Sequence, residues 1–157
     1  MRSSIRTFQK ALDSAVIAEQ LVHINKVTPP GNWKLISKAG ADGQENTHLE
    51  SDFKLKNFSK TWQFLNGIAL AAHSQRHHPT ITTTYNKVNL ILTTHDVGDK
   101  VTHKDLRLAS EIQRIHTEQI ERESTKDANK SNFLEEARNL LDRTKASSII
   151  DQLTRRQ

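Results

Sequence analysis

Cysteine is absent from all 157 residues of the chain. Its absence excludes disulfides, thiolate zinc sites and cysteine nucleophiles. Proline and glycine are scarce, with three and five residues, so a site such as Thr28-Pro29-Pro30-Gly31 is a clear signal that a helix ends. No apolar run is long enough to cross a membrane, and we expect no membrane partner.

The length and composition predict one domain with a real core. Hydrophobic residues make up 34% of the chain and the aromatic residues lie mostly in its middle, which indicates a compact central domain with more polar ends. The formal net charge is +5, but the basic residues are scattered among acidic ones without a dense cluster. This pattern favours a soluble basic protein over a nucleic-acid-binding one.

The N-terminal segment has two interpretations. It contains several basic residues and two serines, and no acid occurs before Asp13. Ile5, Phe8 and Leu12 could share one face of a helix, as in a mitochondrial presequence. The alternative is an ordinary first helix of the domain. We therefore expect a cytoplasmic protein, with a mitochondrial one as the second possibility.

Hydrophobic periodicity predicts seven elements. They are a helix over 7–24, strands over 33–38 and 49–55, a helix from 57 to before Pro79, a long strand over 82–94, and helices over 102–116 and 131–153. The charged segment 118–130 is a helix extension or a linker. Strands joined by hairpins, with helices on one face, are typical of an α+β domain. We place that domain in residues 1–117 and a charged helical extension in 118–157.

Two helices carry further local signals. In the helix after residue 57, which Asn57 or Ser59 can cap, an apolar stripe is predicted to pack on the sheet. The stripe consists of Phe58, Trp62, Leu65, Ala69 and Ala72. Thr102-His-Lys-Asp105 resembles a capping box that begins the next helix. The inward face of that helix is predicted to hold Leu106, Ala109, Ile112 and His116.

The most informative stretch is His73-Ser-Gln-Arg-His77-His78-Pro79, followed by Tyr85 and His95. Histidine suits both proton transfer and metal binding. His73 and His77 are four residues apart, as in zinc-binding helices, but Ser74 stands where a metalloprotease has glutamate. Without cysteine or an acid between the histidines, a metal site is disfavoured. A purely structural role explains one or two of the histidines, but explains poorly their gathering at a helix-to-strand corner.

Seven residues form one long gapped pattern around that corner. They are His73, His77, His78, Pro79, Tyr85, His95 and Asp105. In this order and spacing they resemble the pterin-4a-carbinolamine dehydratases, also called 4a-hydroxytetrahydrobiopterin dehydratases. Flanking residues such as Tyr85-Asn-Lys-Val88 and Leu92-Thr-Thr-His95-Asp96 agree. The resemblance covers about residues 33–115, and a His-His-Pro core within so long a pattern is specific.

The resemblance implies an α+β fold in which helices cover one side of an antiparallel sheet, assembled as a homodimer or homotetramer. It implies the removal of water from a 4a-hydroxytetrahydropterin to give the quinonoid dihydropterin. Neither a metal nor a cofactor is expected, because the pterin is the substrate. The 4a-hydroxyl leaves readily only when protonated, and the pterin N5 must lose a proton, so one acid and one base near neutrality would accelerate both transfers.

Carried over by position, the catalytic residues would be His77, His78 and His95, and the substrate-binding residues would be His73, Pro79, Tyr85 and Asp105. We hypothesise that His77 is the main base or acid, that His95 assists the hydroxyl and that His78 orients the pterin.

Two departures from the family pattern keep another function open. His73 stands where the family often has an acid, and the positive charge of Arg76 is expected to lower the pKa of a neighbouring histidine. The leading alternative is a catalytically weak member that acts as a binding or dimerisation scaffold, since some members serve as dimerisation cofactors of transcription factors. A third interpretation, a histidine metal site, would show as stoichiometric zinc.

Overall fold

The computed structural model describes residues 10–27, 31–40 and 43–154. Its elements are α1 (Ser14–Asn25), β1 (Lys34–Ala39), β2 (Glu45–Lys54), α2 (Phe58–Gln75), β3 (Thr80–Thr84), β4 (Lys87–Leu92), the short 3₁₀ helix η1 (His95–Val97) and α3 (His103–Thr154). The chain divides into two compact units, residues 1–118 and residues 119–157. In residues 10–27, 31–40 and 43–154, no helix combines the length and apolarity needed to cross a membrane.

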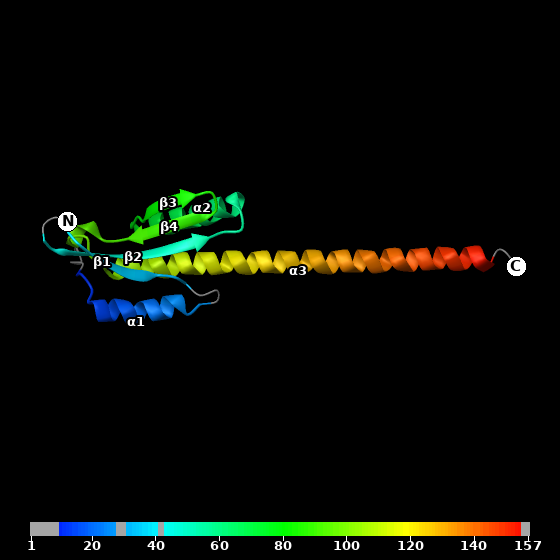
Figure 1. Ribbon diagram of the computed structural model, residues 1–157, viewed down its shortest axis with the longest axis horizontal. Helices are drawn as coiled ribbons and strands as arrows, with labels where there is room; N and C mark the ends of the chain where they lie inside the picture. The colour runs from blue at the N-terminus through cyan, green and yellow to red at the C-terminus, as the bar shows by residue number, and fades with distance from the viewer. Residues whose placement is uncertain (1–9, 28–30, 41–42, 155–157) are drawn as a thin grey trace, which may run out of the picture. The chain divides into compact units, whose positions relative to one another are not determined.

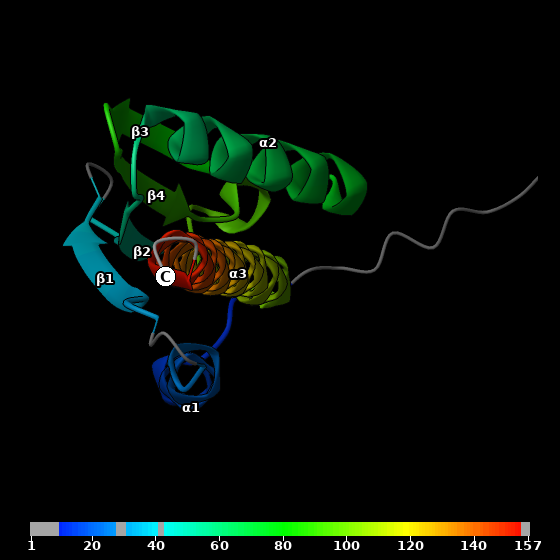
Figure 2. The same ribbon diagram turned by 90° about the vertical axis from the view of Figure 1, so that its right-hand side faces the viewer.

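The sheet is antiparallel throughout, with strand order β1-β2-β4-β3. Figure 2 shows α1, α2 and the first turns of α3 on one side of it. The predicted α+β class, with helices on one face of an antiparallel sheet, is confirmed (Figure 1). Leu49 and Phe53 of β2 pair in register with Leu92 and Val88 of β4, and all four side chains are buried. Their alternation with exposed or half-buried residues fits the two-residue period of a half-buried sheet.

α2 packs through a different stripe from the predicted one. Its buried residues are Thr61, Phe64, Leu65, Ile68, Ala71 and Ala72. Leu65 and Ala72 are therefore correctly predicted, whereas Phe58, Trp62 and Ala69 are exposed. The helix has apolar residues on two sides, and the side with the bulky Phe64 and Ile68 faces the core. A Cβ on Gly67 would lie 2.9 Å from Ile115 of α3, so glycine permits the close approach of these two helices.

The predicted long strand over 82–94 is wrong, because the chain reverses at Tyr85 and Asn86. Tyr85 has a left-handed φ of 54°, and Asn86 donates a side-chain hydrogen bond to the Leu55 carbonyl at 2.8 Å. A two-residue turn therefore separates β3 from β4, and the two strands pair from Thr80↔Ile91 to Thr84↔Lys87. Residues of high β propensity on both sides of the turn gave one continuous pattern in the sequence.

Both terminal helices also differ from expectation. α1 begins at Ser14 rather than Thr7, because Asp13 caps it and accepts a hydrogen bond from the Ala15 amide at 2.9 Å. The predicted targeting segment falls largely on residues 1–9, which lie outside the described residues. Segment 118–130 is helical, so the two predicted helices after residue 102 form the single helix α3. Leu106, Ala109 and Ile112 of its first turns are buried as predicted.

Candidate active site

The C-terminus of α2 fixes the direction of His77. Arg76 ends the helix in the left-handed region with φ 50°, and the His77 amide donates to the Ala72 carbonyl at 3.1 Å. This is the hydrogen-bond pattern of a helix C-cap that ordinarily uses glycine. The turn directs the His77 side chain inward, and His77 is only 8% exposed. His78, the next residue, is exposed.

The β3–β4 hairpin brings the end of β4 back to the same corner. β3 begins at Thr80, directly after Pro79, and Thr80 pairs with Ile91 near the end of β4. Thr94 and His95 therefore follow β4 on the side of the molecule where α2 ends. The chain thus reverses between Pro79 and His95, which the sequence pattern could not specify.

The N-terminus of α3 supplies Asp105. Its Oδ2 accepts a hydrogen bond from the Thr102 amide at 2.7 Å, and Thr102 Oγ1 accepts one from the Lys104 amide at 3.2 Å. The Thr102–Asp105 capping box is therefore confirmed. A carboxylate in the first turn of a helix is also favoured by the helix dipole.

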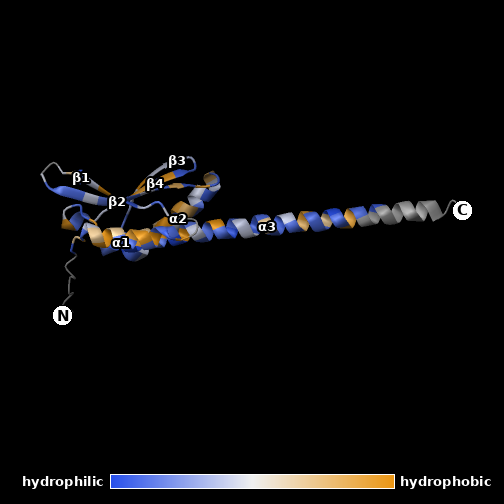
Figure 3. Cartoon of the chain, turned by 60° about the horizontal axis from the view of Figure 1, so that its bottom comes forward, coloured by the Kyte–Doolittle hydropathy of each residue, from blue (hydrophilic) through white to orange (hydrophobic). Residues whose placement is uncertain are grey.

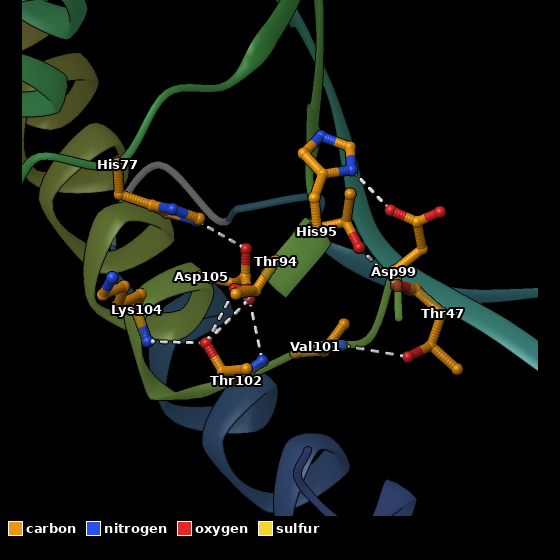
Figure 4. Close-up of polar contacts among 10 residues, drawn as sticks. Thr47, His77, Thr94, His95, Asp99, Val101, Thr102, Lys104 and Asp105 are labelled. Carbon is orange, nitrogen blue, oxygen red and sulfur yellow. Dashed lines mark hydrogen bonds and ion pairs between the residues drawn. The ribbon is translucent and has the colours of Figure 1, made fainter. Parts of the chain in front are cut away.

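The two segments meet in a buried, hydrogen-bonded histidine–aspartate pair. His77 Nε2 lies 2.6 Å from Asp105 Oδ1, and Asp105 is fully buried (Figure 4). The second carboxylate oxygen, Oδ2, also accepts from Thr94 Oγ1 at 2.7 Å and from Thr102 Oγ1 at 3.1 Å. A buried carboxylate requires this many donors, because its desolvation is otherwise costly. When Nε2–H donates to Asp105, the other ring nitrogen of His77, Nδ1, is left to accept a proton.

A second histidine–aspartate pair lies on the other side of Thr94. His95 Nδ1 is hydrogen-bonded to Asp99, and Figure 4 shows its ring directed away from Asp105. The His95 side chain is 81% exposed. Gly98, with φ 76°, donates its amide to the His95 carbonyl at 3.0 Å and closes this short loop. The loop holds an imidazole that remains open to solvent.

The loop that carries His95 is anchored to β2. The Thr47 amide donates to the Asp99 carbonyl at 2.9 Å, and Thr47 Oγ1 accepts from the Val101 amide at 3.0 Å. Thr93 Oγ1 in turn donates to the Thr47 carbonyl at 3.0 Å. A threonine on a neighbouring strand therefore fixes the loop on both sides of His95.

The other predicted site residues are spread more widely. His73 is exposed on the last turns of α2, and Pro79 is half-buried at the corner. Tyr85 is 65% exposed in the turn before β4, whereas His95 follows the opposite end of that strand. The structure thus brings together the segments that carry His77, Pro79, His95 and Asp105, and within one chain it leaves Tyr85 at the far end of the hairpin.

Sequence reasoning missed the hydroxyls that hold the buried pair. Thr94 Oγ1 and Thr102 Oγ1 lie 2.8 Å apart and both donate to Asp105. The signals were present, since Thr94 immediately precedes His95 and Thr102 begins the capping box. Asp99, the partner of His95, is absent from the predicted site residues.

A further histidine, His48 of β2, lies outside the corner and differs in its surroundings. It is buried, and its Nε2 has no hydrogen-bond partner among the described residues. Desolvation by burial lowers the pKa of His48, the charge of Lys38 lowers it further, and Glu50 opposes both effects. Burial without a hydrogen-bonded carboxylate therefore favours the neutral imidazole.

Among the described residues the corner holds no metal cluster, and a hollow of the first unit lies elsewhere. Within the described ranges, no group of three or more histidine, aspartate or glutamate side chains is placed to hold a metal ion. One hollow of the first unit lies between α1 and the first turns of α3, with His23, His103 and Arg107 in its lining, and does not include His77, His78 or His95. Within the corner, both His78 and His95 are exposed.

Comparison with known proteins identifies the family. A family model described as pterin 4 alpha carbinolamine dehydratase matches residues 10–115. A Thermomicrobium roseum protein named "Putative pterin-4-alpha-carbinolamine dehydratase" is 36% identical over 104 residues, which cover 66% of this chain and 95% of that protein. A Chloroflexus aurantiacus protein of the same name is 38% identical with the same coverage.

A solved structure agrees with the sequence relatives. The crystal structure of a transcriptional coactivator/pterin dehydratase from Brucella melitensis aligns with a TM-score of 0.55 at 28% identity and covers 68% of this chain and 98% of that one. The region matched by the family model contains the histidine corner and both histidine–aspartate pairs. The chain belongs to the pterin 4 alpha carbinolamine dehydratase family.

Proposed function

We propose that this chain dehydrates a 4a-hydroxytetrahydropterin, the 4a-carbinolamine, to the quinonoid dihydropterin and water. The observation that carries the proposal is the His77–Asp105 pair at a corner that also presents His78 and His95. Membership of the family supports the substrate class. The required chemistry is proton transfer, for which no metal or cofactor is needed.

His77 is the base in this proposal. Asp105 and the two threonines fix its ring through Nε2. Nδ1 then takes the proton from the pterin N5, and the N5 electron pair forms a double bond to C4a. Asp105 is a positioning residue, because it is fully buried and contacts His77 rather than the surface. A positioned general base contributes about 10²–10⁴-fold in rate.

His95 is the acid that completes the reaction. In its protonated form it delivers a proton to the departing 4a-hydroxyl, so that water rather than hydroxide leaves as the C4a–O bond breaks. Asp99 orients the ring through Nδ1, which leaves Nε2 to transfer the proton. Since His95 is exposed, it exchanges protons with solvent between turnovers. We assign the exposed His78 to holding the pterin ring beside His77, and expect His73, Pro79 and Tyr85 to contribute to substrate binding.

The test follows the absorbance loss of 4a-hydroxytetrahydropterin with purified wild-type protein and the His77→Ala/His78→Ala variant. We expect dehydration well above the spontaneous rate in the wild type and only the spontaneous rate in the variant. His23→Ala, in the last turn of α1, is the matched control and should retain wild-type activity. A wild-type rate equal to that of the double variant would refute the enzymatic function.

A scaffold role is the second candidate. The related Brucella melitensis protein is named as a transcriptional coactivator as well as a pterin dehydratase. In this chain Phe58 and Trp62 are exposed on α2, with ring centroids 6.0 Å apart. Exposed aromatic pairs are frequent at protein interfaces. An inactive wild-type protein would leave this role as the better explanation, and we expect a homodimer or homotetramer in either case.

A further inference from the structure

The second unit carries an apolar stripe that the dehydratase function does not use. We define the C-terminal stripe as Phe133, Leu134, Ala137, Leu140 and Leu141 of α3. These residues recur at i, i+1, i+4, i+7 and i+8, which places them on one face of a helix. The four large side chains are each more than half exposed. Figure 3 shows hydrophobic residues interrupting an otherwise hydrophilic part of α3.

A helix cannot cover its own apolar face. The second unit is described as a helix up to Thr154. Single exposed apolar residues are ordinary, whereas a contiguous patch marks an interaction site. An isolated helix is also only marginally stable in water without packing of its apolar face. The family match ends at residue 115, so the stripe is an addition to the dehydratase unit.

The net charge of the second unit limits which class of partner can bind the C-terminal stripe. Between residues 119 and 154 there are seven acidic and six basic residues, so this segment is nearly neutral. A nucleic acid or an anionic membrane would require a basic face, which these residues do not supply. The partner must instead offer an apolar surface with charges of both signs.

Charged residues along one side of the stripe alternate in sign. Glu135, Arg138, Asp142 and Lys145 follow one another at i, i+3, i+7 and i+10 and so share one side of the helix. They line one shallow hollow on the helix surface together with Leu134 and Leu141. The charged row therefore borders the apolar stripe directly.

We propose that the C-terminal stripe pairs with the same stripe of a second copy of this chain, with the two helices antiparallel and centred near Leu140. Reversing the charged row turns its order from −+−+ into +−+−. Glu135 then lies level with Lys145 of the second copy, and Arg138 lies level with Asp142 of the second copy. A parallel pair would bring same-numbered residues to one level and would leave this match unused. Isologous pairing of this kind closes after two copies.

The first test measures the mass of the full-length wild type and of two variants by sedimentation velocity over a range of concentrations. Leu134→Glu/Leu141→Glu should weaken the association by roughly 100-fold or more, because four apolar side chains per dimer are replaced by like charges. Asn132→Glu, exposed and outside the hollow, should leave the association unchanged. Association through residues 1–118 is common to all three proteins, so the difference reports the stripe alone. Equal masses for wild type and the leucine variant would overturn the proposal.

The second test determines the direction of pairing. Arg138→Glu and Asp142→Lys should each weaken association by roughly fivefold, since each creates two like-charge contacts per dimer. Mixing the two variants should restore wild-type association, because residue 138 of each copy then meets an opposite charge at residue 142 of the other. Within each helix residues 138 and 142 still carry like charges, so intrahelical effects cannot produce rescue. Absence of rescue in the mixture would overturn the antiparallel arrangement.

Discussion

The two histidine–aspartate pairs share their chemistry and differ in burial. His77–Asp105 is buried, and its carboxylate also accepts from Thr94 and Thr102. His95–Asp99 lies on the surface within a single short loop. Removing one partner of a buried pair costs much folding free energy, whereas an exposed pair contributes little to stability. In the proposed mechanism, this difference separates a buried base from an exposed acid that exchanges protons with water.

The largest expected effect comes from removing the buried carboxylate. Asp105→Ala should lower the free energy of unfolding by about 3 kcal/mol, because His77 and two threonine hydroxyls lose their acceptor in the core. Asp99→Asn, which tolerates the left-handed φ of 54° at this position, should change it by less than about 1 kcal/mol, as expected for an exposed pair. Urea denaturation followed by circular dichroism measures both. Similar losses in the two variants would show that burial does not distinguish the pairs.

A substitution at His77 can separate its hydrogen bond to Asp105 from its proposed role in proton transfer. In His77→Gln the amide can still donate to Asp105, so this variant should be more stable than His77→Ala. Both should lose roughly 100-fold or more in kcat with little change in KM, because glutamine cannot accept the proton. Steady-state kinetics beside thermal melts gives the answer. A glutamine variant with near wild-type kcat would remove His77 from the role of base.

The turn that directs His77 inward offers the next prediction. Arg76 adopts a left-handed conformation that costs a non-glycine residue about 1 kcal/mol. Arg76→Gly should therefore stabilise the protein by about 0.5–1 kcal/mol while keeping the His77 direction. Arg107→Gly, at an exposed position inside α3, is the contrasting control and should destabilise it. A destabilised Arg76→Gly protein would mean that the arginine side chain has a structural role of its own.

The smallest effect concerns His48, which is buried without a hydrogen-bonded carboxylate. Its pKa is lowered in the folded state, chiefly by desolvation, so the unfolded chain binds the proton more tightly. The neutral His48 therefore causes no loss of stability above its pKa in the unfolded chain, near 6.5. Stability is lost as the pH falls through that value, because the unfolded chain then takes up the proton first. His48→Gln should show a shallower loss of stability between pH 7.5 and 5.5 than the wild type. Parallel stability curves for the two proteins would contradict this account.

Local signals predicted the elements better than their packing. The caps at Asn57 and at Thr102–Asp105 were correct, since a cap depends on residues within one turn. The stripe of α2 was only partly correct, because apolar residues occur on two sides of that helix and only the sheet decides which side is covered. The turn at Tyr85 was missed, since tyrosine rarely adopts positive φ and gave no turn signal.

The candidate site shows the same limit. The histidines of the corner were identified from their spacing, because that pattern is carried by the chain itself. The bond between His77 and Asp105 joins residues 28 apart and depends on two helix ends meeting. Hydrophobic periodicity does not indicate that these two helix ends lie together. The hydrogen bonds from Thr94 and Thr102 to Asp105 depend on the same arrangement.

The sequence by itself determined the α+β class, most helix and strand positions, and the set of histidines, because propensity, capping and hydrophobic period act over a few residues. Only the tertiary structure decided which histidine is buried and which is exposed. The hairpin between β3 and β4 returns the chain to the end of α2, and the start of α3 places a carboxylate there. Burial is a property of the packed chain, and burial makes one of two like pairs rigid while the other remains open to water.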